Sequence, residues 1–166
     1  MLFIGYKVLL VAALLLLNPA VISPQEDEAT RRAWNLPVEP FRVVGNIYYV
    51  GVAGVTSFLI TTPEGHILLD GGFSETVPRI QDSVRKLGFR LEDVKVLINS
   101  HAHFDHAGGF AQLKRLTGAQ LMISEADAEL ISKGGQGDFF RGEKPTFEPA
   151  TVDRRLRDND GSDSAA

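Results

Sequence analysis

Apolar residues between positions 41 and 70 fall into four short runs that are rich in β-branched and aromatic side chains. These runs cover residues 41–44, 47–52, 57–61 and 66–70. Residues 45–46 (Gly-Asn) and 63–65 (Pro-Glu-Gly) separate neighbouring runs, and such residues mark turns between strands. The pattern predicts an antiparallel meander in this part of the chain.

The spacing of apolar positions changes after residue 72. Apolar side chains at positions 77, 80, 84 and 87 follow the spacing of one helix face, and Gly88 marks its end. Ser124 with Asp127 three residues later resembles a capping box at the start of another helix. The predicted helices cover residues 77–87, 110–117 and 125–132, and the predicted strands cover 94–98, 121–123 and 151–156.

A meander followed by alternating helices and strands is typical of a layered α/β domain. The chain has 166 residues, which is the length of one domain. We therefore expect one α/β domain over residues 41–160. Residues 24–40 are charged and contain several prolines, and they are interpreted as an N-terminal arm.

The first residues have the pattern of an export signal. Lys7 precedes an unbroken apolar run at residues 8–17, and Asn18-Pro19 ends it. A bilayer span needs about 20 apolar residues, so this run favours a secretory signal peptide over residues 1–23. We expect a periplasmic or secreted protein without stable membrane association after signal cleavage.

The composition excludes several kinds of chemistry. The chain has no cysteine, which excludes disulfides, thiol nucleophiles and cysteine-based zinc sites. Its 17 basic and 21 acidic residues give a net charge of −4, and no basic block predicts nucleic-acid binding.

Three of the four histidines lie within six residues, directly after the predicted strand 94–98. His101 and His103 are two positions apart, so an extended backbone directs both side chains to the same side. Asp105 and His106 follow where the next helix begins. Imidazole and carboxylate groups are zinc donors, so the cluster predicts a metal site.

The sequence also points to two further residues, Asp70 and His66. Asp70 ends a predicted strand before Gly71-Gly72, and it either caps this turn or holds a metal-bound histidine by a hydrogen bond. His66 stands alone at a strand start and is interpreted as a surface or structural histidine.

The run from His101 to His106 matches the His-x-His-x-Asp-His signature of the metallo-β-lactamase superfamily. The segments at 65–72, 87–89, 99–101, 106–109, 118–121 and 152–158 resemble class B β-lactamases of subclass three. The resemblance implies an αβ/βα sandwich, of which this chain would supply the N-terminal half. It also implies zinc-dependent hydrolysis of a small-molecule β-lactam substrate.

By this resemblance, the site would hold two Zn²⁺ ions. His101 and His103 would bind the first ion, and Asp105 and His106 the second, with Asp105 also a catalytic residue and Asp70 supporting the ligands. Family members supply one further histidine per metal from later in the chain, whereas no histidine follows His106 here. We therefore expect an incomplete domain with an unrelated tail at residues 161–166, weak or partial zinc occupancy, and little activity from this chain alone.

Two alternatives remain open. Lactonases and thioesterases share the core signature, so either activity could replace β-lactam hydrolysis. The lack of distal histidines also fits a non-catalytic, metal-binding remnant.

Overall fold

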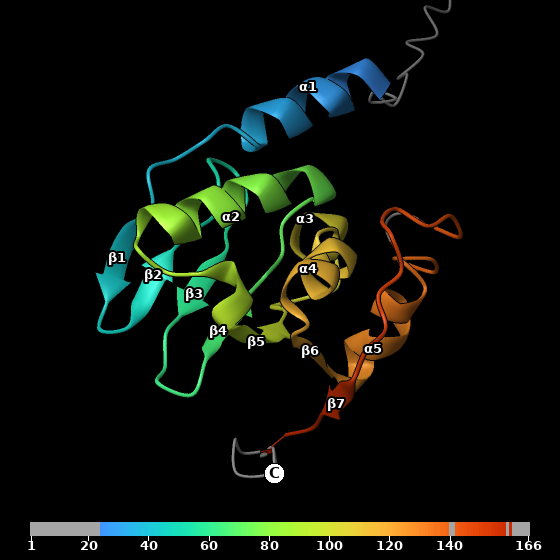
Figure 1. The fold of residues 1–166 in the computed structure, drawn as a ribbon. Helices are drawn as coiled ribbons and strands as arrows, with labels where there is room; N and C mark the ends of the chain where they lie inside the picture. The colour runs from blue at the N-terminus through green and yellow to red at the C-terminus, as the bar shows by residue number, and fades with distance from the viewer. Residues whose placement is uncertain (1–23, 140–141, 159, 161–166) are drawn as a thin grey trace, which may run out of the picture.

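The computed structural model describes residues 24–139, 142–158 and 160. The predicted signal peptide (1–23) and tail (161–166) lie outside these residues. The described part forms a seven-stranded sheet whose strands neighbour one another in chain order, with helices packed against it (Figure 1). This arrangement confirms the predicted α/β class.

The first four strands form the predicted antiparallel meander. They are β1 (Phe41–Val44), β2 (Ile47–Tyr49), β3 (Phe58–Ile60) and β4 (His66–Leu69). Strand β1 has the predicted bounds, whereas β2, β3 and β4 are one to three residues shorter than the runs that predicted them, because the ends of these runs lie in the connecting loops.

The remaining strands run parallel to β4 and follow helical connections. The strands are β5 (Val94–Ile98), β6 (Gln120–Ser124) and β7 (Arg154–Leu156), and the helices are α2 (Val77–Lys86), α3 (Phe104–Ala107), α4 (Phe110–Thr117) and α5 (Glu125–Ser132). Short 3₁₀ helices cover Ser74–Thr76 and Leu91–Asp93. The Ser124 hydroxyl accepts the N–H of Asp127 at 3.2 Å, which confirms the predicted start of α5.

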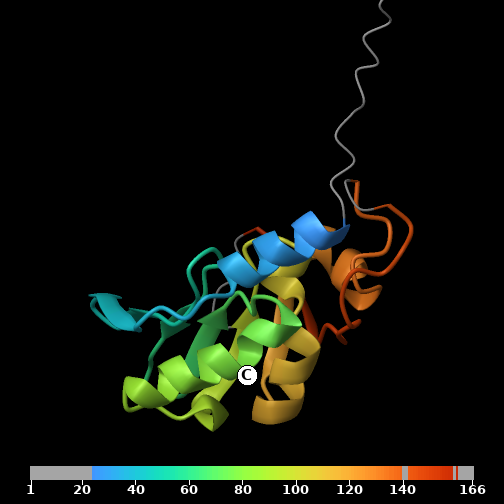
Figure 2. The same ribbon diagram turned by 90° about the horizontal axis from the view of Figure 1, so that it is seen from above.

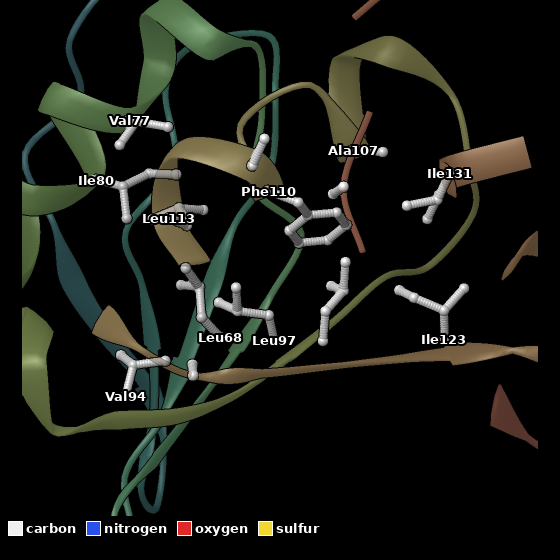
Figure 3. Packing of buried hydrophobic residues seen from close by; sticks show 14 of the residues in the cluster. Leu68, Val77, Ile80, Val94, Leu97, Ala107, Phe110, Leu113, Ile123 and Ile131 are labelled. Carbon is white, nitrogen blue, oxygen red and sulfur yellow. The ribbon is translucent and has the colours of Figure 1, made fainter. Parts of the chain in front are cut away.

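The core lies between one face of the sheet and the helices, as Figure 3 shows. Leu68 and Leu97 project from neighbouring strands toward Phe110 and Leu113 of α4, and all four side chains are fully buried. Each buried Leu or Phe side chain contributes about 1.5–3 kcal/mol through burial. This packing fixes the sheet against α4, which directly follows the histidine-rich loop.

The opposite face of the sheet is also apolar. Its side chains alternate with the buried ones along each strand, and all are partly exposed: Phe58, Ile60, Ile67, Leu69, Val96 and Ile98. The strand register places Ile60 opposite Ile67, and Ile67 opposite Val96. The sheet therefore has an apolar, partly exposed face on the side opposite the helices.

The segment interpreted as an arm contains a helix, α1 (Pro24–Trp34). Pro24 is its first residue, a position where proline is compatible with a helix, and Arg31 and Arg32 lie in its last turn. Trp34 packs against Gly54, where an added Cβ would lie 2.6 Å from the indole ring. Figure 2 shows α1 on the same side of the molecule as α3.

Within the described part of the chain, no helix is long and apolar enough to span a membrane.

Candidate metal centre

The histidine-rich loop connects the carboxyl end of β5 to α4. His103 precedes the first residue of α3, and Asp105 and His106 lie within this short helix. The His101 and His103 ring centroids are 4.6 Å apart. One donor atom from each of His101, His103 and Asp105 lies within 4.8 Å of the other two, so these three side chains could share a metal ion.

His106 lies beside these three residues, and its ring also contacts Asp70. Its ring centroid lies 4.0 Å from that of His101, and its Nε2 atom lies 3.4 Å from Asp105 Oδ2. On the other side of the ring, Nδ1 lies 2.9 Å from Asp70 Oδ2. This contact leaves Nε2 as the ring nitrogen that faces Asp105.

Asp70 joins the end of β4 to the histidine-rich loop. Its Oδ1 accepts the Ser100 backbone N–H at 2.7 Å, and its Oδ2 accepts the Ser100 hydroxyl at 2.8 Å. The Asp70 residue is 2% exposed and has a φ of +64°, a left-handed conformation that few non-glycine residues adopt. Asp70 therefore holds both the backbone of the histidine-rich loop, through Ser100, and the ring of His106.

Glycines allow the loop after β4 and the histidine-rich loop to contact each other through their backbones. The Gly71 N–H donates to the His106 carbonyl at 2.7 Å, and the Gly109 N–H donates to the Gly72 carbonyl at 3.0 Å. A Cβ on Gly109 would lie 2.2 Å from the Gly71 carbonyl oxygen, which no side chain could accommodate.

Neighbouring charges set the protonation of the cluster. Burial disfavours the charged form of His106, but Asp105 and Asp70 outweigh this effect and raise the pKa of His106 to about 9. Burial raises the pKa of Asp105, but its hydrogen bond to His106 brings the pKa below the ordinary value. Burial, together with the neighbouring His106 and His103, lowers the pKa of His101. His101 is therefore favoured as a neutral imidazole and Asp105 as a carboxylate, the forms in which they bind metals.

The family model described as the metallo-beta-lactamase superfamily matches residues 50–164. The chain belongs to the metallo-β-lactamase superfamily. A metallo-β-lactamase from Cronobacter sakazakii, described by its HARLDQ motif, is 43% identical with a TM-score of 0.75, covering 78% of this chain and 50% of that one. The class B3 di-zinc metallo-β-lactamase LRA-12, from an Alaskan soil metagenome, is 40% identical with a TM-score of 0.73, covering 77% and 49%.

Curated relatives in the superfamily match a shorter region. The N-acyl homoserine lactonase AttM of Agrobacterium fabrum is 33% identical over 85 residues, or 38% of this chain and 32% of the lactonase. A lactonase from Bacillus cereus is 32% identical over 78 residues. The chain therefore spans about half the length of the solved β-lactamases and about a third of the lactonases.

The donor set fits the metal that this superfamily membership implies. Two imidazoles and a carboxylate supply nitrogen and oxygen donors of the kind zinc accepts, and their donor atoms lie within 4.8 Å of one another. Ser100 and Asp70 contact the Nδ1 atoms of His101 and His106 and so orient the rings.

Two further residues, His66 and Asp138, differ in how much of their surroundings the sequence predicted. His66 lies away from the cluster with its ring edge-on to Phe89 at 5.4 Å, which agrees with its structural interpretation. Asp138, by contrast, had no local signal, yet its Oδ2 lies 3.4 Å from Nε2 of His103. The contact between Asp138 and His103 depends on how α5 and the loop after it pack, so it has no signal in the local sequence.

Proposed function

We propose that the histidine-rich loop is the metal-binding loop of a zinc-dependent hydrolase that opens β-lactam rings. The observation that carries this proposal is the convergence of His101, His103 and Asp105 within 4.8 Å. The solved β-lactamases support this substrate class over lactones, because they are 40–45% identical over about three quarters of the chain.

In this proposal, His101 and His103 hold one zinc ion, and Asp105 and His106 hold a second. Bound zinc lowers the pKa of its water to about 7 and stabilises negative charge on the substrate oxygen. The low pKa of Asp105 keeps its carboxylate ionised and able to bind. Asp70 fixes the ring of His106 through Nδ1, so that Nε2 faces the same space as Asp105.

The number of proposed ligands predicts how well this chain performs alone. Two protein ligands per ion are one fewer than the three typical of catalytic zinc. We therefore expect weak zinc binding and negligible β-lactam hydrolysis by the 166-residue chain. Efficient turnover by this chain would contradict that expectation.

Zinc titration of the purified chain tests the site. Zn²⁺ should bind to the wild type and raise its melting temperature, whereas Asp105→Asn and His101→Ala should remove this increment. His66→Ala is the matched control, since His66 lies outside the cluster, and it should keep the increment. Equal loss in all three variants would exclude the proposed ligands.

Hydrolysis assays separate the possible reactions. Nitrocefin and a carbapenem test β-lactamase activity, and an N-acyl homoserine lactone tests the lactonase alternative suggested by the curated relatives. Residual turnover at high enzyme concentration that disappears in Asp105→Asn identifies the substrate class. Residual turnover of the lactone but not of nitrocefin or the carbapenem would favour the lactonase alternative.

We further propose that residues 1–23 direct export, as their sequence pattern predicts. Fractionation of bacteria expressing the full chain should recover a shortened form outside the cytoplasm. Recovery of only the uncleaved chain in the cytoplasm would contradict this proposal.

A further inference from the structure

The two ring nitrogens of His103 face different surroundings. Nε2 lies 3.4 Å from Oδ2 of Asp138, within ion-pair distance. The His103 side chain is 41% exposed, whereas that of Asp138 is only 6% exposed. A buried carboxylate is costly unless it interacts with a proton donor or a cation, so this contact stabilises a proton on Nε2 of His103.

The other two histidines of the cluster show the reverse arrangement. Nδ1 of His101 and Nδ1 of His106 each lie 3.2 Å from the Ser100 hydroxyl oxygen. These two rings are contacted by Ser100 at Nδ1, and Nε2 of His106 lies near Asp105. His103 instead contacts a carboxylate, Asp138, through Nε2.

The loop that carries Asp138 is held by several backbone hydrogen bonds. It follows α5, where the Gly135 N–H donates to the Leu130 carbonyl at 2.8 Å and the Asp138 N–H donates to the Gly135 carbonyl at 3.2 Å. Gly134 and Gly135 have positive φ angles, and Gly134 would place an added Cβ 2.4 Å from the Phe147 carbonyl oxygen. These backbone hydrogen bonds help to position the segment that carries Asp138.

We propose that Asp138 is a positioning residue that holds Nε2 of His103 and so presents Nδ1 to the metal. This inference rests on the proposed function for the identity of the metal site. Histidine ligands are oriented in this way by a carboxylate on the second nitrogen, and loss of such a partner weakens metal binding by about 10- to 100-fold. Asp138 would act on the metal only through His103.

The first test observes His103 directly in the metal-free chain. Long-range ¹H–¹⁵N spectra of histidine-labelled protein report which ring nitrogen carries the proton. The wild type should show His103 with its proton on Nε2, and Asp138→Ala should shift the population toward Nδ1. An unchanged tautomer in a folded Asp138→Ala variant would overturn the proposal.

The second test measures Zn²⁺ affinity by competition with a chromophoric chelator. Asp138→Asn keeps the size of the side chain and removes its charge, so it keeps the assay interpretable if Asp138→Ala does not fold. We expect Asp138→Asn to weaken Zn²⁺ binding by about tenfold or more. Glu143→Gln, an exposed carboxylate on the same loop, is the matched control and should bind as the wild type does.

The two tests distinguish failure of the inference from failure of the proposed function. If the wild type binds no Zn²⁺, the proposed function fails, while the tautomer spectra still judge the contact between Asp138 and His103. If the wild type binds Zn²⁺ and Asp138→Asn binds it equally tightly, Asp138 does not position the ligand.

Discussion

The guanidinium carbon of Arg31 lies 4.6 Å from the ring centroid of Phe73. The same guanidinium lies 5.6 Å from the ring centroid of Phe104, the residue between His103 and Asp105 in the chain. Its Nε and Nη2 donate to the Glu75 carboxylate at 2.5 and 2.9 Å. Arg31 therefore connects α1 both to the loop after β4 and to the histidine-rich loop.

Replacing Arg31 with methionine should loosen α1. Because Arg31 and Glu75 are partly exposed, their ion pair is screened, and we expect the cation–π contact and the pair together to contribute only about 1 kcal/mol to the free energy of unfolding. Urea denaturation followed by fluorescence measures this, because Trp34 in α1 is the only tryptophan of the chain.

Arg32 provides the control for this experiment. It lies on the same helix turn, and its pair with Glu28 is largely exposed at 70% and 64%. Arg32→Met should leave both the unfolding midpoint and the Trp34 emission unchanged. Equal effects of the two substitutions would show that the ring contacts of Arg31 do not stabilise the protein.

Asp70→Ala should be more destabilising than Asp70→Asn. Alanine leaves the partly buried Ser100 N–H and the His106 ring without their acceptor, which costs about 1–3 kcal/mol, and it also disfavours the positive φ. Asparagine tolerates that φ and keeps one acceptor oxygen. Urea unfolding of both variants measures the difference, and equal losses would show that the hydrogen bonds do not determine stability.

Asp153 should make the free energy of unfolding depend on pH in the acidic range. Burial raises the pKa of Asp153, but Lys114 and the N–H of Leu121 outweigh this effect and lower it below 3.8. A lowered folded-state pKa gives a stabilising contribution that is present above 3.8 and is lost as the pH falls through the folded-state value. Asp153→Asn should therefore reduce stability at pH 7, by less than about 1 kcal/mol at this exposed site, and much less in strong acid.

Urea unfolding of Asp153→Asn and wild type at several pH values measures this convergence. Asp158→Asn alters an exposed carboxylate nearby and should show no such pH-dependent difference. A constant gap between Asp153→Asn and wild type across the acidic range would contradict the electrostatic explanation.

The apolar sheet face should promote self-association. Ile67 and Val96 are paired across β4 and β5 and are partly exposed on the face opposite the helices. The double substitution Ile67→Thr with Val96→Thr keeps good strand formers and reduces the apolar area, so it should lower association in sedimentation experiments. Val44→Thr, at the exposed edge strand β1, should have a smaller effect.

The sequence revealed those elements whose periodicity is strong. Residues 94–98 and 125–132 form a strand and a helix with the predicted bounds, because a continuous apolar run and a capping serine are both local signals. Helix α1 was not expected, since its stability depends on contacts such as Arg31 with Phe73 that are distant in the chain.

In the candidate site, too, the residues on one local segment could be predicted from the sequence, whereas contacts between distant segments could not. The spacing of His101, His103, Asp105 and His106 was visible because all four lie on one loop. Asp70 was recognised as a candidate, but its hydrogen bonds to Ser100 and His106 depend on how the end of β4 packs beside the loop after β5. Asp138 could not be found, because its distance from His103 depends on how α5 and the following loop pack.

The change from antiparallel to parallel pairing at β4 has a consequence for the order of folding. Strands β1–β4 pair with their neighbours in the chain through short turns, and such local contacts form early. Asp70 meets Ser100 only after a segment of 30 residues containing α2 has closed on itself and β5 has paired with β4. We therefore expect the histidine-rich loop to reach its final arrangement late in folding, once the crossover between these two strands is complete.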